Sequence, residues 1–130
     1  MYYPTKDDVL DLHEDALAAF GGESGVMDEE ALEGALARPQ ASFGGVERFP
    51  DVPSKAAALL HGLVMAHAFV DGNKRTAAAV ALTFVEQNGH QLHATGDEIE
   101  SVIRTAAGGE LDVDDLTEWF EEHTEPVDDA

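Results

Sequence analysis

Apolar residues recur along most of this chain at intervals of three and four positions, the spacing that places them on one face of an α-helix. Each such stretch begins near a polar residue able to cap a helix and ends near glycine, proline or asparagine. No two segments show a convincing strand pattern. The pattern therefore predicts an all-α protein of about six helices, at about residues 5–20, 28–38, 51–69, 76–88, 95–107 and 112–120.

The helix expected at 51–69 contains the most apolar part of the chain. Residues from Ala56 to Ala68 leave it almost no polar face, and helices that are apolar all round lie in the centre of a fold. The helix expected at 76–88 is also mostly apolar. These two helices are therefore expected to form the centre of a compact bundle and to hold the connection between them from both sides.

The other segments are expected to be irregular. Residues 40–52 are too rich in glycine for a helix and predict a loop or a short hairpin, and residues 91–94 predict a connector that could be extended. Residues 121–130 are mostly acidic and predict a frayed tail. A chain of this length is expected to form one domain over residues 1–130, with its core at about 3–120.

The composition is strongly acidic. Aspartate and glutamate number 27 against 7 lysines and arginines, which gives a formal net charge of −20 at pH 7, and the acids are spread along the chain. This pattern is similar to that of proteins from salt-loving microbes, whose acidic surfaces stay soluble at high ionic strength, so a halophilic source is expected. The alternative is an ordinary acidic protein whose charges repel one another at low salt.

The same composition argues against several classes of function. No cluster of bases is longer than Lys74-Arg75, so binding of nucleic acid through a basic face is not expected. The longest apolar run, from Ala56 to Ala68, is too short to span a membrane. Cysteine is absent, which excludes disulfides and thiolate metal sites and fits a cytoplasmic location.

The stretch from His67 to Thr76 carries most of the candidate chemistry. It combines a histidine, a carboxylate, a glycine turn, an amide and two cations on the connection between the two central helices. Gly72 permits a tight turn, and the helix after it directs unpaired N–H groups and the positive end of its dipole out of that turn. Such a helix start can bind phosphate. The stretch therefore predicts a site for a phosphorylated ligand.

Four side chains of this stretch have alternative interpretations. Lys74 and Arg75 oppose the helix dipole, so they indicate a demand for positive charge unless they pair with surface acids. Asp71 either holds Mg²⁺ beside a polyphosphate or caps the helix. His67 is either a general base for an incoming hydroxyl or a core histidine bonded to a carbonyl.

The other histidines are not expected to act in a site. His61 is expected to be packed in the core, and His13 and His123 to lie on the surface. His90 and His93 are three positions apart but lack a third ligand nearby, so no zinc site is predicted.

The residues of the stretch from His67 to Arg75 follow the pattern H-x-F-x-D-G-N-K-R, which resembles the signature of the Fic/Doc superfamily in its Doc (death-on-curing) form. The similarity extends from about Tyr3 to Phe120. It implies a compact helical bundle with the motif loop at its centre. Family members transfer part of a nucleotide to a hydroxyl of a protein.

Doc-type members carry lysine, as at Lys74, where AMP-transferring members have glycine. The resemblance therefore implies a toxin that uses ATP and Mg²⁺ and transfers the γ-phosphate to a threonine of the elongation factor that delivers aminoacyl-tRNA. It also implies a small antitoxin whose C-terminal segment folds over the active site. Transfer of AMP, or a catalytically silent module that binds nucleotide or antitoxin, are the alternatives.

The resemblance also implies a role for each residue of the motif. His67 would be the base that activates the target hydroxyl, and Asp71 would hold Mg²⁺. Gly72 and Asn73 would bind phosphate through backbone and amide groups.

The last two residues of the motif are both cations. Lys74 and Arg75 would stabilise negative charge on the transferred phosphoryl group.

Residues 40–52 would correspond to the flap that positions the target chain. The inhibitory motif of the superfamily has no clean instance here, because the nearest stretch, Thr117–Glu122, ends in glutamate. Inhibition by a separate partner is therefore expected.

Overall fold

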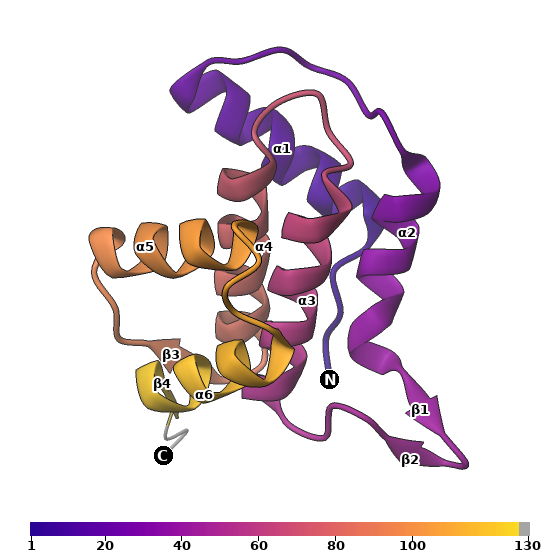
Figure 1. Cartoon of the computed structure of the whole chain (residues 1–130), viewed down its shortest axis with the longest axis vertical. Helices are drawn as coiled ribbons and strands as arrows, with labels where there is room; N and C mark the ends of the chain where they lie inside the picture. Colours follow the sequence, from indigo (N-terminus) through magenta and orange to yellow (C-terminus); the bar gives the residue numbers. More distant parts are fainter. Residues whose placement is uncertain (128–130) are drawn as a thin grey trace.

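The computed structural model describes residues 1–127, and this part of the chain contains six α-helices and four short strands (Figure 1). A 3-10 turn, η1 (Arg38–Gln40), follows the second helix directly. The all-α class and the expected set of helices are confirmed. The helices are α1 (Lys6–Phe20), α2 (Glu29–Ala37), α3 (Val52–Ala66), α4 (Asn73–Gln87), α5 (Gly96–Ala107) and α6 (Val113–His123).

Polar caps start five of the six helices. Each cap side chain accepts a hydrogen bond from a backbone N–H in the first turn and so satisfies a donor that has no partner within the helix. The starts of these helices are thus set by local sequence, which explains why the pattern predicted them. The caps are Thr5, Asp28, Asp51, Thr95 and Asp112.

Helix α3 lies in the centre of the bundle, in contact with α2, α4, α5 and α6 (Figure 1). Its residues from Ala56 to Leu60 are at most 2% exposed. Helix α4 adds Phe84 and Val85 to the same core, each at most 1% exposed. None of the helices in residues 1–127 combines the length and apolarity that a bilayer span requires. The connection between α3 and α4 is therefore held at both ends by well-packed helices.

The segment expected as a loop or hairpin contains two strands, β1 (Ser42–Phe43) and β2 (Val46–Glu47), paired antiparallel. It precedes α3, whereas the His67 motif follows α3, and this helix of 15 residues spans about 22 Å. The hairpin and the α3–α4 connection accordingly lie at opposite ends of the bundle in Figure 1. The hairpin is confirmed, but its place at the far end of α3 does not fit the expected flap that positions a target chain at the motif.

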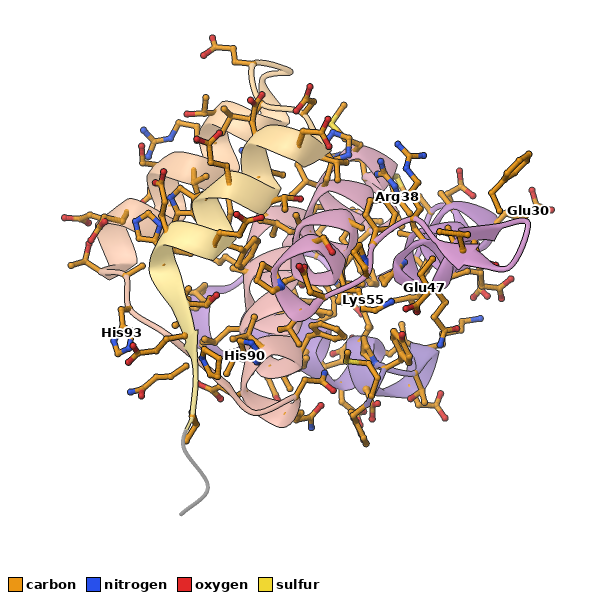
Figure 2. The ribbon with its side chains drawn as sticks, turned by 90° about the horizontal axis from the view of Figure 1, so that it is seen from below. Glu30, Arg38, Glu47, Lys55, His90 and His93 are labelled. Atoms are coloured by element: carbon orange, nitrogen blue, oxygen red, sulfur yellow. The ribbon has the colours of Figure 1, made fainter. Side chains whose placement is uncertain are left out.

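A buried lysine fixes this hairpin to the core. Lys55 of α3 is 1% exposed and donates hydrogen bonds to the carbonyl oxygen of Pro39 and to the carboxylate of Glu47, each at 3.0 Å (Figure 2). Burial acts to lower the pKa of Lys55, but its interactions with Glu47 and Tyr3 outweigh that effect and the pKa is raised. Lys55 therefore stays charged at neutral pH and ties the hairpin to the start of α3.

A second antiparallel pair, β3 (His90–Leu92) and β4 (Thr124–Pro126), was not expected from the sequence. Because α6 continues to His123 and β4 follows it, the predicted frayed tail is wrong for residues 121–127. The same prediction for residues 128–130 lies outside the described part of the chain. Strands of three residues are too short to show an alternating pattern, and their pairing depends on contacts distant in sequence.

Candidate active site

The motif loop that joins α3 to α4 is longer than expected. Helix α3 ends at Ala66 instead of residue 69, and α4 begins at Asn73 instead of residue 76. His67 ends α3 because it adopts the left-handed conformation, with φ 45° and ψ 48°. Within residues 1–127 no other non-glycine residue has positive φ. A histidine in this strained conformation, with an exposed ring, is typical of a functional position.

Phe69 anchors the loop in the core. Its side chain is 2% exposed and stacks on the ring of His13, with centroids 3.9 Å apart. The backbone of Phe69 also forms an isolated antiparallel bridge with Val26, which lies between α1 and α2. The loop is therefore held from both sides before any ligand binds.

Asn73 holds the same part of the loop from α4. Its side-chain oxygen accepts from the N–H of Phe69 at 3.0 Å, and its side-chain NH₂ donates to the Phe69 carbonyl at 2.9 Å. The sequence predicts that this amide binds phosphate, but here it serves first to position the loop. The backbone N–H of Asn73, in the first turn of α4, has no partner within the helix and is available to a ligand.

Three histidines differ from their predicted environments. His13, expected on the surface, is 2% exposed. The side chain of His123, also expected on the surface, is 19% exposed and stacks on Trp119 with centroids 4.1 Å apart. His61, expected in the core, is only half-buried and lies 2.8 Å from a guanidinium nitrogen of Arg38.

His13 supports the motif loop directly. Its Nε2 lies 2.8 Å from the carbonyl oxygen of Asp71, and its ring covers Phe69. Its position four residues after Val9 and four before Leu17 places it on the inner face of α1, and this spacing is the signal that could have identified it.

We expect His13→Ala to lower the free energy of unfolding by about 1–3 kcal/mol, because the part-buried Asp71 carbonyl loses its partner and Phe69 loses its stacked ring. Urea titration in 2 M KCl measures this change. His93→Ala is the matched control, since His93 is exposed and its ring contacts the exposed Glu125. Equal stability of the two variants would contradict a supporting role for His13.

Asp71 does not cap α4, so the alternative interpretation of this residue as a helix cap is wrong. Its Oδ2 instead accepts from the backbone N–H of Glu23 at 3.1 Å, and the rest of the side chain is exposed. A Cβ on Gly22 would approach the Asp71 side chain to 3.3 Å, and Gly22 has a φ of +125°, so this contact needs a glycine. The α1–α2 connection therefore orients the carboxylate.

The start of α4 differs from the other helix starts. Its cap is Gly72, with φ 77° and ψ 17°, and no side chain accepts from the first turn. That turn contains no acid but carries Lys74 and Arg75, both exposed. Unpaired N–H groups, the positive end of the dipole and two cations thus lie together, which is an arrangement for binding an anion.

Two cavities open beside this helix start, of about 450 Å³ and about 540 Å³. Both are lined by Gly72, Lys74 and Arg104 of α5. His67, Asp71 and Asn73 line the first, and Arg75 lines the second. The structure thus brings all six residues predicted from the motif to two neighbouring cavities.

Two features of these cavities could not be read from the motif. Arg104, which lies 28 positions after Thr76 in the sequence, reaches the site only through the packing of α5. The guanidinium of Arg75 lies 4.0 Å from the ring centroid of Phe20, a cation–π contact that holds it at the rim of the second cavity.

The residues that could hold a metal ion are few. Residues 1–127 contain no group of three or more histidines, cysteines or acids placed to bind a metal together. Mg²⁺ commonly keeps several waters and binds one or two carboxylates together with substrate phosphates. The exposed carboxylate of Asp71 beside an anion site fits that mode of binding.

Comparison with known proteins shows the family to which the chain belongs. A family model described as the Fic/DOC family matches residues 3–85, and the chain belongs to this family. It is 45% identical over 116 residues to a protein named Toxin Doc from Mycolicibacterium smegmatis, an alignment that covers 88% of this chain and 87% of that protein. It is 30% identical over 118 residues to Protein kinase doc of Escherichia phage P1, covering 91% and 92% of the two chains.

Proposed function

We propose that this protein is an ATP-dependent protein phosphotransferase that acts as the toxin of a toxin–antitoxin pair. The observation that carries the proposal is the start of α4, which lacks a side-chain cap and carries Lys74 and Arg75 beside the cavity of His67 and Asp71. The names of the two relatives, a toxin and a protein kinase, support the same reading.

In the proposed reaction, the oxygen of a target hydroxyl attacks the γ-phosphorus of ATP, the bond from that phosphorus to the bridging oxygen breaks, and ADP leaves. His67, exposed at the first cavity, would take the proton of the hydroxyl. The N–H groups of α4, with Lys74 and Arg75, would stabilise the charge on the transferred group. Mg²⁺ bound by Asp71 would supply further positive charge to the phosphate oxygens.

Lys74 is the residue that favours phosphate transfer over AMP transfer. It lines both cavities, so its side chain occupies space at their junction. By the family resemblance, a lysine here fills room that the α- and β-phosphates use in AMP-transferring members. The nucleotide would then bind in the reversed sense and present its γ-phosphate to the hydroxyl.

The proposed target is a threonine of a translation elongation factor, and the proposed partner is a small antitoxin that covers the cavities. Both come from the resemblance to Doc-type proteins and from the toxin name of one relative. The position of the β1–β2 hairpin, at the far end of α3, means that the target chain would have to be held by surfaces other than that hairpin.

The test uses ATP labelled at either the α- or the γ-phosphate. The protein, Mg²⁺ and molar KCl are incubated with a cell lysate, and labelled proteins are separated and identified by mass spectrometry. The proposal expects γ-label, and no α-label, on a threonine of a lysate protein. Label from the α-phosphate would identify an AMP-transferase instead, and ATP binding with no label at all would identify a silent binding module.

A further inference from the structure

Arg104 enters the site from a helix that the motif does not include. It lies in the last turn of α5 and lines both cavities beside Lys74. Its guanidinium forms an ion pair with Glu100, one turn earlier on the same helix. Both side chains are exposed, at 68% for Arg104 and 69% for Glu100, and Glu100 lines the second cavity.

The distribution of bases makes this position informative. Arg48 lies over the ring of Phe49 beside the hairpin, whereas Lys74, Arg75 and Arg104 all line the second cavity. In a chain with 7 bases and 27 acids, three bases at one opening indicate a demand for positive charge there. The other three bases make contacts within the fold: Lys6 with Glu29, Lys55 with Glu47, and Arg38 with His61.

We propose that Arg104 is a third phosphate-binding cation of the site, and that Glu100 competes with the nucleotide for its guanidinium. This inference rests on the proposed function and adds a residue to it. A guanidinium can form two parallel hydrogen bonds with a phosphate, which a lysine cannot. An exposed ion pair of neighbouring helix turns is weak, so a polyphosphate in the cavity can displace Glu100 and take over the arginine.

The two residues should then have opposite effects on nucleotide affinity. We expect Arg104→Gln to raise the Kd for a non-transferable ATP analogue about tenfold, because a charge-assisted contact is lost. Glu100→Gln should lower the Kd about threefold, because it removes a competitor for the guanidinium. Isothermal titration calorimetry of the full chain with the β,γ-imido analogue of ATP, in Mg²⁺ and 1 M KCl, measures both.

Two controls separate this role from general effects of charge and folding. Arg48→Gln removes the same charge directly after β2, whose hairpin lies at the opposite end of the bundle from the α3–α4 connection (Figure 1), and it should leave the Kd unchanged. The double variant Glu100→Gln/Arg104→Gln should bind as weakly as Arg104→Gln alone. If Glu100→Gln lowers the Kd by the same factor in the Arg104→Gln background as in the wild-type protein, Glu100 acts through its charge alone. That result would refute competition for the guanidinium.

The failure of this inference differs from a failure of the proposed function. If Arg104→Gln has the same Kd and the same melting temperature as the wild-type protein, the proposed role of Arg104 is refuted. The proposed function is not affected by that result. An analogue that does not bind the wild-type protein at all would overturn both.

Discussion

Replacement of His67 by alanine is expected to reduce transfer of γ-label from ATP to protein by about 10²–10⁴-fold, the usual contribution of a general base. Binding of the ATP analogue should change by less than about twofold, because the proposed phosphate contacts come from the start of α4 and not from the imidazole. The exposed His67 ring makes no hydrogen bond or ion pair with residues 1–127, so its loss removes little packing. Labelling rates and calorimetry on the same protein samples measure the two effects.

The backbone conformation of His67 requires a second variant. Alanine is strained at φ 45°, so His67→Ala could disturb the loop as well as remove the imidazole. Asparagine adopts the left-handed conformation more readily, and His67→Asn therefore removes the base with less effect on the end of α3. Both variants should be inactive. Label transfer by His67→Asn at the wild-type rate would rule out His67 as the base.

The melting temperature is expected to rise by about 10 °C or more when KCl is increased from 0.1 M to 2 M. At 0.1 M the screening length is about 10 Å, and at molar salt it falls to about 3 Å, so repulsion among the surface acids is largely removed. The net charge of −20 makes that repulsion large for a chain of 130 residues. A few kcal/mol of relieved repulsion corresponds to roughly 10 °C for a domain of this size. Thermal unfolding followed by circular dichroism across a KCl series measures the effect.

A variant with fewer acids separates screening from the general stabilising effect of salt. Glu118, Glu121 and Glu122 are exposed on α6 and form no ion pair within residues 1–127. Replacing all three with glutamine should raise the melting temperature in 0.1 M KCl and reduce its dependence on salt. A melting temperature that is the same at all KCl concentrations would contradict the expectation of a halophilic source.

The fold was predictable because its helices carry local signals. Thr95 and Asp112 cap the helices that they were expected to start, and each forms a reciprocal pair of hydrogen bonds with the third residue of its helix. The apolar run of α3 predicted a central helix, and that helix is buried. These signals come from residues that are close together in the sequence, so the sequence alone is enough to recognise them.

The errors come from contacts between distant residues. His13 is buried because it meets Phe69 and Asp71, 56 and 58 positions later. Strand β3 exists because β4 returns beside it. The early end of α3 depends on the left-handed turn at His67, a conformation that is uncommon even for histidine, so the sequence alone does not predict it.

The candidate site was predictable because its residues are nearly contiguous in the sequence. His67 and Asp71 lie in the connection between two helices and Lys74 lies in the first turn of the second, so their grouping follows from chain connectivity. Arg104 was missed because only the packing of α5 brings it to the cavities. The hairpin was expected to act as a flap because a resemblance in sequence does not give the distance between segments at the two ends of a helix.

The grouping of Lys74, Arg75 and Arg104 at one opening also affects which anions can reach this molecule. Most of the remaining surface carries acids, which repel any approaching polyanion. The proposed triphosphate would contact mainly these three bases, whereas an RNA strand or an anionic bilayer would also meet the acids around them. Potassium ions that screen those acids should therefore accelerate nucleotide entry, the reverse of the usual effect of salt on polyanion binding.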